Sequence, residues 1–258
     1  MSKCVISMTI YDVEHYSDEE RQMIIDGYAP HERDARANGV PTLGSGAIFP
    51  VSESDITCRP FEIPFYWPRI CGIDFGWDHP TAAVWLAHDV DNDVVYITDV
   101  YRASQTTIPV IASAIKARGN YIPVAWPHDG YQVRDAMHGQ QLSKQYKSEG
   151  VNMMKQHAQF EKERYKEGQG SVVSVEAGIQ EILTRMQTGR WKVFDTCEAW
   201  LEEFRMYHRD NGKIVKLYDD AISASRYAYM MLRYAKTPEQ KKITQQPGWI
   251  PSDPGMGY

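Results

Sequence analysis

The chain has few of the features that mark secreted, membrane-spanning or zinc-knuckle proteins. Its four cysteines are far apart and no CxxC pair or histidine cluster accompanies them, which argues against a zinc knuckle and fits a reducing compartment with unpaired thiols. No stretch approaches the roughly 18 consecutive apolar residues of a membrane span, so no membrane partner is expected. The N-terminal MSKCVISMTI also lacks the basic segment, apolar block and cleavage site of a signal peptide.

The sequence also lacks an excess of positive charge and a nucleotide-binding loop. It has 28 Lys and Arg against 34 Asp and Glu, a net charge of -6. A protein that wraps nucleic acid over its whole surface is normally basic, so a nucleic-acid role must rest on a local patch or on acidic residues that hold metal ions. No GxxxxGK[ST] occurs, which argues against ATP hydrolysis by that route. No Ser-His-Asp or Cys-His pattern indicates a covalent nucleophile.

Composition is otherwise that of an ordinary folded protein. The 258 residues are 43% hydrophobic and 24% charged, typical of one large domain or two small ones. Residues 1–58 are expected to be a helical and looped lead-in without a compact core, because short helical segments alternate there with proline and glycine. Residues 59–236 carry the regular patterns and are expected to be the folded domain. The proline-rich residues 237–258 are expected to be a disordered tail.

The order of the expected elements predicts the fold class. Three successive segments separated by polar turns have strand patterns and predict a three-stranded antiparallel meander: 69–74, 81–88 and 94–101. Further strands are expected at 121–126 and 151–157, and helices at 109–118, 140–148, 174–188, 199–208 and 219–235. The polar stretch 159–170 predicts an exposed hairpin tip or loop. Together these elements predict an α/β fold, a mixed sheet with helices on both faces.

Acidic residues lie where several of these elements end. Asp74 closes the first strand of the meander, Asp129 follows the strand at 121–126, and Asp219 and Asp220 open the last helix. Behind that pair, small residues recur at helical spacing and would let the helix lie close against the sheet: Ala221, Ala224, Ser225 and Ala228. Such packing would bring the pair toward Asp74 and Asp129.

A gathered set of carboxylates has the chemistry of a two-metal phosphodiesterase. Carboxylate oxygens are the hard ligands that Mg²⁺ or Mn²⁺ prefers, and two such ions stabilise the attacking and leaving oxygens of a phosphodiester. The alternative stays open for each residue taken alone, since Asp after a strand often forms a turn and Asp at a helix start often caps it. Asp74 is harder to explain that way because burying an unpaired charge in an apolar strand is costly.

Several runs of the sequence, in their order and spacing, resemble a known family. The runs ARANGVPTLGSGAIFP, WPRICGIDFGWDHPTAAVW, PHDG, VEAGIQEILTRMQTGRWKVF and YDDAISASRYAYM, from about Tyr11 to Ala235, are similar to the C-terminal nuclease domain of the large terminase subunit of tailed bacteriophages. The resemblance implies an RNase H-like mixed sheet and metal-dependent cleavage of concatemeric viral DNA during packaging. It places the metal ligands and catalytic acids at Asp74, Asp129 and the Asp219–Asp220 pair, with Asp219 slightly favoured by register and both expected to touch metal.

The resemblance also implies partners and a location. A complete large terminase carries an N-terminal ATPase that this chain lacks, so the chain is expected to be the nuclease part of a longer polypeptide. Double-stranded DNA, the portal protein and the small terminase subunit are the partners implied, in the host cytoplasm at the procapsid.

DNA contacts are expected at lysines near the acids and near the polar loop. Lys213 and Lys216 precede the Asp pair, and Lys155 lies before the loop; they would hold phosphates without reading bases. The alternative is a solvated surface of mixed charge, since glutamates alternate with lysines in the loop. Two other functions also stay open, a resolvase- or transposase-like nuclease and a non-catalytic docking module of a packaging motor.

Overall fold

The structure is a computed structural model that describes residues 9–13, 15–28, 33, 36–37, 39, 46–132, 140–161 and 173–238. Most of the polar loop expected at 159–170, and the tail from residue 239 onward, lie outside the described residues. In the described residues, no helix is long and apolar enough to cross a membrane.

The centre of the fold is the predicted antiparallel meander, which the structure confirms. Its strands are β2 (Arg69–Asp74), β3 (Thr81–Asp89) and β4 (Val94–Ala103). Strand β2 pairs with β3 along its whole length, from Arg69 opposite Ala87 to Asp74 opposite Ala82. The polar turn between β3 and β4 is closed by Asp93, whose φ of 52° is a left-handed conformation that Asp tolerates in turns.

Parallel strands extend the meander on both sides. On one side β5 (Val124–Ala125) is parallel to β2; on the other β6 (Trp191–Phe194) is parallel to β4, and β1 (Thr57–Cys58) is parallel to β6. The six-stranded order is β1-β6-β4-β3-β2-β5. This is the predicted mixed sheet. Strands β1 and β6 escape sequence reasoning because they are only two and four residues long and have too few positions to show a period.

Two expected strands differ from the structure. The strand expected at 121–126 is only Val124–Ala125, because Pro123 has no N–H to donate to a ladder and only its carbonyl pairs, with the Cys71 N–H at 2.9 Å. The strand expected at 151–157 is wrong. Only Met153 makes an isolated parallel bridge, to Val124, and the segment otherwise runs beside β5 without regular pairing.

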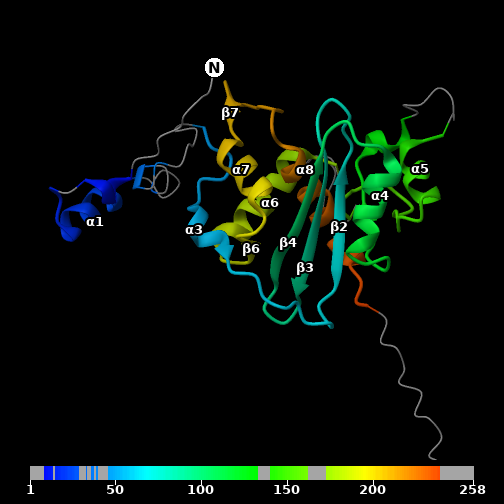
Figure 1. Cartoon of the computed structure of the whole chain (residues 1–258), viewed down its shortest axis with the longest axis horizontal. Helices are drawn as coiled ribbons and strands as arrows, with labels where there is room; N and C mark the ends of the chain where they lie inside the picture. Colours follow the sequence, from blue (N-terminus) through cyan, green and yellow to red (C-terminus); the bar gives the residue numbers. More distant parts are fainter. Residues whose placement is uncertain are drawn as a thin grey trace, which may run out of the picture.

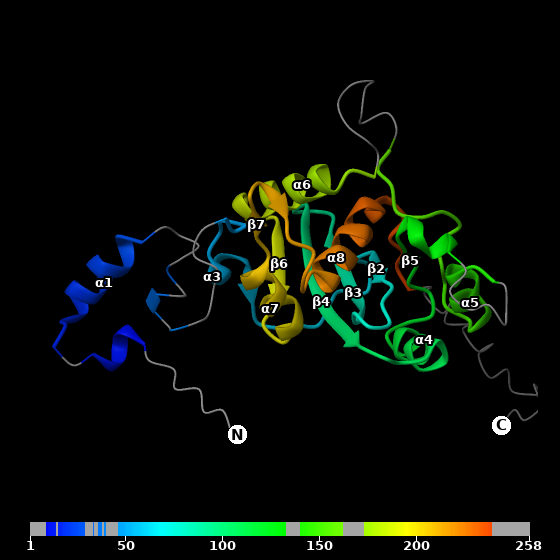
Figure 2. The same ribbon diagram turned by 90° about the horizontal axis from the view of Figure 1, so that it is seen from above.

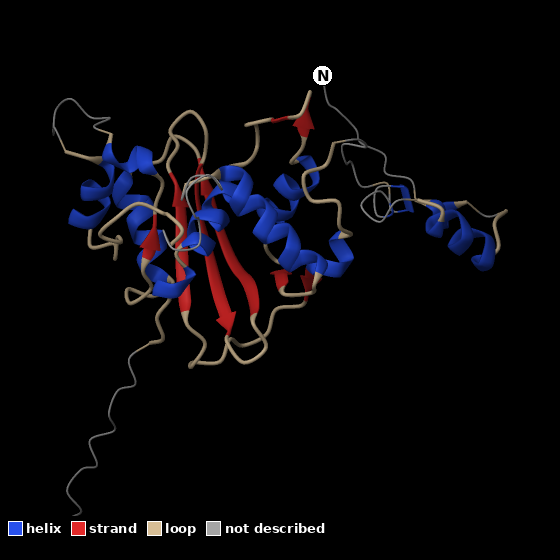
Figure 3. Ribbon diagram, turned by 180° about the vertical axis from the view of Figure 1, so that it is seen from behind, coloured by secondary structure: helices blue, strands red, loops and turns tan. Residues whose placement is uncertain are grey.

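Helices cover both faces of the sheet, as predicted (Figures 1 and 2). Helices α4 (Ile108–Ala117) and α5 (Leu142–Ser148) enclose one core, and α6 (Val175–Gln187), α7 (Glu198–Met206) and α8 (Asp220–Met230) enclose the other. Figure 3 shows the second group lying across the strands. The remaining short elements are η1 (Ile10–Asp12), α3 (Glu53–Ile56), η2 (His128–Tyr131), β7 (Arg209–Asp210), β8 (Lys213–Ile214) and η4 (Leu232–Tyr234). The last helix ends at Met230, before the expected residue 235.

The lead-in contains both a separate helix and a part of the core. Helix α1 (Asp18–Asp26) has the capping box that Ser17 and Glu20 form, buries no residue, and lies apart from the sheet (Figure 1). The end of the lead-in differs from expectation, because Ile48, Phe49 and Ile56 are buried in the core under α6 to α8. The short strand β1 anchors this segment by pairing with β6.

Helix α8 lies unusually close to strand β2. The four small residues of its predicted stripe are fully buried. A Cβ added at Gly72 would lie 1.9 Å from the Ala224 carbonyl oxygen and 2.8 Å from the Ala228 nitrogen. Only glycine allows this approach of helix to strand, which brings the first turn of α8 to the end of β2.

Candidate functional site: carboxylates at the end of the sheet

Asp74 is the last residue of β2 and is directed toward α8. Side chains alternate along a strand, so Asp74 shares the face of Gly72, the residue against which the α8 backbone packs. The next residue, Phe75, points to the opposite face and joins the core under α4 and α5. The carboxylate of Asp74 therefore emerges between the sheet end and the first turn of α8.

The other predicted acids reach the same place from separate segments. Strand β5 runs parallel to β2, so their carboxyl ends meet at one edge and Asp129, in η2 just after β5, lies beyond the end of Asp74's strand. Asp219 is the N-cap residue of α8 and Asp220 is its first helical residue. All four acids are partly buried.

The electrostatics of Asp74 agree with this placement of the carboxylates. Its pKa is raised well above the ordinary value of 3.8, first by burial and then by the negative charges of Asp129, Asp220 and Asp219, with Arg226 acting in the opposite direction. Burial and Asp220 likewise raise the pKa of Asp219. Since like charges raise each other's pKa only at short range, the fold brings together the acids that sequence reasoning singled out.

The carboxylates do not form a closed cluster by themselves. Among the described residues, no three His, Cys, Asp or Glu side chains are close enough together to hold a metal ion. Cationic side chains offset part of the negative charge: Arg226 lowers the pKa of Asp74 and Asp219, and Lys216 lowers that of Asp219. His79 also acts on the pair and lowers the pKa of Asp220.

A buried carboxylate that sequence reasoning missed lies behind the α8 pair. Glu203 on α7 is 1% exposed, and its Oε2 accepts hydrogen bonds from the backbone N–H groups of Ala221 at 2.7 Å and Ile222 at 3.0 Å. Burial raises its pKa to about 7, against the lowering effects of the Ile222 N–H and of Arg102. A sequence signal existed, since Glu203 falls on the buried face of α7 with Trp200 and Phe204.

Arg102, at the end of β4, links Glu203 to the acid pair. Its Nε lies 3.5 Å from Glu203 Oε1, and its Nη2 lies 4.0 Å from Asp220 Oδ2. Arg102 also lowers the pKa of Asp220. The site therefore joins β2, β4, η2, α7 and α8, of which sequence reasoning identified β2, η2 and α8.

The candidate DNA-contacting lysines are exposed. Lys213 lies in the β7–β8 hairpin and Lys216 follows that hairpin, between it and Asp219. Lys155 follows Met154, whose backbone N–H donates to the Val124 carbonyl of β5. Of these three lysines, Lys216 is the one whose charge lowers the pKa of Asp219. The lysines of the polar loop, Lys162 and Lys166, lie outside the described residues.

Aromatic and histidine rings surround the segment that carries Asp129. The rings of His128 and His157 lie edge to face at 5.0 Å, and Tyr131 packs against both, at 5.4 and 5.6 Å. Burial and His128 lower the pKa of His157. This ring cluster gives η2 a firm position beside β5, because Tyr131 also packs on the buried Trp126 at 4.9 Å.

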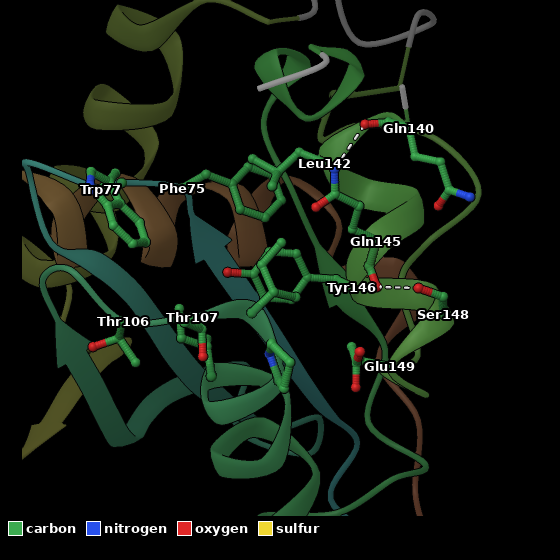
Figure 4. A pocket seen from close by; sticks show the side chains of 14 residues that line it. Phe75, Trp77, Thr106, Thr107, Gln140, Leu142, Gln145, Tyr146, Ser148 and Glu149 are labelled. Carbon is green, nitrogen blue, oxygen red and sulfur yellow. Dashed lines mark hydrogen bonds between the residues drawn. The ribbon is translucent and has the colours of Figure 1, made fainter. Parts of the chain in front are cut away.

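A separate cavity of about 820 Å³ opens on the other face of the sheet (Figure 4). It lies between the loop after β2 and helices α4 and α5, with the rings of Phe75 and Tyr146 5.3 Å apart in its wall and the exposed Trp77 at its edge. Because Phe75 points away from α8, the cavity lies on the α4–α5 side, whereas the carboxylates face α8.

The sheet order, the meander and the placement of the acids define the RNase H-like class of nuclease folds. Residues 71–232, more than half of the chain, match the family described as Terminase RNaseH-like domain. Residues 2–56 match the family described as Terminase large subunit, T4likevirus-type, N-terminal. The chain therefore belongs to the family of RNase H-like domains of terminases, and the family resemblance seen in the sequence is confirmed.

Individual relatives agree with this assignment. The large terminase subunit of Salmonella phage P22 is 48% identical over 249 residues, covering 94% of this chain and 48% of the relative. That of Enterobacteria phage LP7 is 49% identical over 231 residues, covering 89% and 47%. The solved P22 large terminase nuclease domain superposes with a TM-score of 0.66 at 47% identity, over 75% of this chain and 95% of that domain. The chain spans about half the length of the curated relatives it matches.

Proposed function

We propose that this chain is a metal-dependent DNA endonuclease that cuts concatemeric viral DNA during genome packaging, using two divalent ions, Mg²⁺ or Mn²⁺. The observation that carries the proposal is the placement of Asp74, Asp129 and the Asp219–Asp220 pair, from three distant segments of the chain, at one edge of the sheet, where the other three acids raise the pKa of Asp74. Membership of the terminase nuclease family supports the same activity.

The chemistry of these side chains, carboxylate oxygens throughout, suits a hard divalent cation. The pKa of Asp74 is raised because its buried carboxylate faces other carboxylates, and a bound cation relieves that repulsion. Carboxylate oxygens are the ligands such ions prefer. When bound, two ions would stabilise charge on the attacking and leaving oxygens of the phosphodiester.

The chain's own residues then take distinct roles in this proposal. Asp74 is the central ligand, since the other acids all act on it; Asp129 approaches from the β5 side, and Asp219 and Asp220 from α8. Arg226, which is buried on α8, offsets part of the repulsion at Asp74. Arg102 likewise lowers the pKa of Asp220.

The DNA and the packaging partners belong to the same proposal. Lys213, Lys216 and Lys155 contact phosphates of double-stranded DNA without reading sequence. The ATPase domain of a longer polypeptide, the portal protein and the small terminase subunit are the other partners, at the procapsid in the host cytoplasm. The family match and the roughly half-length coverage of the relatives support these assignments.

Replacing Asp74 tests the activity. In a plasmid-nicking assay with Mg²⁺ or Mn²⁺, Asp74→Ala is expected to reduce cleavage by more than about a hundredfold, since even residues that only support metal ligands account for about 10- to 100-fold. Asp91→Ala is the control, because Asp91 is exposed in the β3–β4 turn at the opposite end of the sheet. Circular dichroism should show both variants folded.

Three results would contradict the proposal in different ways. Undiminished nicking by Asp74→Ala would reject the site. A preference for branched junctions over linear duplex would indicate a resolvase- or transposase-like nuclease. Absence of metal-dependent cleavage at every protein concentration, together with binding to a portal or small-subunit partner, would indicate a docking module without catalysis.

A further inference from the structure

The first turn of α8 is capped in an unusual way. An Asp at the N-cap position normally turns its carboxylate back to accept the N–H of the second or third helical residue. Asp219 occupies that position but its side chain makes no capping hydrogen bond. The second and third helical residues are Ala221 and Ile222, and both of their N–H groups donate instead to Oε2 of Glu203, at 2.7 and 3.0 Å.

The side chain of Glu203 is buried at the position where it makes this contact. It projects from α7 with 1% of its surface exposed, so its carboxylate has little access to water. Its other oxygen lies 3.5 Å from Arg102 Nε. A carboxylate at a helix N-terminus satisfies N–H groups that otherwise lack partners and interacts favourably with the helix dipole. Glu203 thus supplies from a neighbouring helix what the N-cap side chain ordinarily supplies.

We propose that Glu203 is a positioning residue that caps α8 in place of Asp219 and so keeps the Asp219 carboxylate available to a divalent cation. The inference rests on the proposed function of the acid cluster. The N–H groups of Ala221 and Ile222 already donate to Glu203, so the two donors that an N-cap side chain ordinarily takes are occupied and Asp219 makes no capping hydrogen bond. Without Glu203, those donors compete with the cation for the same carboxylate.

Arg102 completes the arrangement on the other side of the pair. One guanidinium contacts both Glu203 and Asp220, at 3.5 and 4.0 Å. It therefore places one positive charge between the capping carboxylate and the neighbouring acid. The two acids of the pair therefore differ in their contacts. Asp219 makes no capping hydrogen bond, and Asp220 lies 4.0 Å from the Arg102 guanidinium.

The test compares Mn²⁺ binding by three variants of the whole chain, measured by isothermal titration calorimetry without DNA. Glu203→Ala is expected to weaken Mn²⁺ binding by about tenfold or more, the size seen when residues that orient metal ligands are lost. Glu203→Gln keeps a carbonyl oxygen for both N–H groups and is expected to bind close to the wild type. Glu202→Ala, an exposed change one residue earlier on α7, is the matched control.

A crystal structure of Glu203→Ala supplies a second measurement. The Asp219 carboxylate is expected to accept from the Ala221 or Ile222 N–H in that variant. If Glu203→Ala does not fold, Glu203→Asp replaces it, because it retains the charge but shortens the reach by one methylene, and the same weakening of Mn²⁺ binding is expected.

The outcomes separate this inference from the proposed function. Unchanged Mn²⁺ affinity in Glu203→Ala, or in Glu203→Asp where that variant is used, overturns the capping role and leaves the nuclease proposal standing. A loss in Glu203→Gln as large as in Glu203→Ala also overturns it, because the charge rather than the cap would then matter. A wild-type chain that binds no Mn²⁺ overturns the proposed function and this inference with it.

Discussion

At the scale of single residues, the buried carboxylate of Asp74 is expected to lower the stability of the fold. Asp74 places a carboxylate where burial and three other acids all disfavour its charge, with Arg226 as the opposing cation. Such an arrangement is costly for a purely structural residue. In the proposed function, a bound divalent cation would supply the missing positive charge.

The first prediction follows from this cost. Asp74→Asn is expected to raise the melting temperature in EDTA by a few degrees at neutral pH, because it removes the repulsion while keeping the shape. The pKa of Asp74 is raised in the folded state from 3.8, so the folded chain holds its proton longer than the unfolded chain. Stability of the wild type in EDTA should therefore fall as pH rises from about 4, and the variant should show less of this fall.

Differential scanning calorimetry from about pH 5 to about pH 8 provides the measurement. Mn²⁺ should raise the melting temperature of the wild type more than that of Asp74→Asn. A variant less stable than the wild type in EDTA would show that the carboxylate contributes to the fold and would remove the reason for regarding it as a metal ligand.

At the scale of elements, the decisive contact is between β2 and α8. The stripe of alanines and Ser225 on the helix meets the glycine in the strand, and the close approach carries the Asp219–Asp220 pair to Asp74. The helix side of this contact is visible in the sequence as a period of small residues. The strand side is a single glycine, Gly72, whose role becomes clear only when its neighbour across the sheet face is known.

Gly72→Ala tests that contact. The added Cβ would lie 1.9 Å from the Ala224 carbonyl oxygen, which is backbone and cannot turn aside, so α8 must move away. Overpacking of this kind costs about 1–3 kcal/mol or more. We expect a lower free energy of unfolding in urea and reduced nicking, because the helix that moves carries two of the acids.

Gly27→Ala is the matched control for this substitution. Gly27 ends α1 with a φ of -69°, an ordinary conformation for alanine, and its nearest backbone contact would be 3.3 Å. Stability and nicking should stay close to the wild type. If Gly72→Ala and Gly27→Ala had equal effects, the loss could not be attributed to the close approach of α8 to β2 at Gly72.

At the scale of the whole molecule, the folded unit extends further toward the N-terminus than its regular pattern does. Ile48, Phe49, Val51 and Ile56 are buried in the core beneath α6 to α8, and β1 continues the sheet. The segment precedes the part in which strands and helices can be recognised from periodicity. We therefore propose that a stable nuclease domain includes residues 48–58, which the expected boundary at residue 59 leaves out.

Truncation measures this boundary. A chain that starts at Gly46 is expected to unfold cooperatively with a melting temperature near that of the full chain, whereas one that starts at Arg59 is expected to be insoluble or to melt without a cooperative transition. The reason is that burial of each large apolar side chain is worth about 1.5–3 kcal/mol, and several are lost together. Two chains of equal stability would return the boundary to the expected residue 59.

The patterns in the sequence accounted for the parts of this protein whose interactions are local. The meander, the helices and the capping box at Ser17 all express periods or short spacings along the chain. The acids at Asp74, Asp129, Asp219 and Asp220 were identified because each lies at the end of such an element. The segment 151–157 misled because its apolar residues resemble a strand, although only Met153 pairs.

By itself, then, the sequence determined the mixed sheet, the terminase family and the acidic residues to consider, because periodicity and short motifs are properties of neighbouring residues. Only the tertiary structure decided that Asp219 does not cap its own helix, since Glu203 reaches the N–H groups of Ala221 and Ile222 from α7. It also decided that residues 48–56 belong to the core. Contacts between distant segments depend on how elements pack, and no local pattern records which side chain another element will bring.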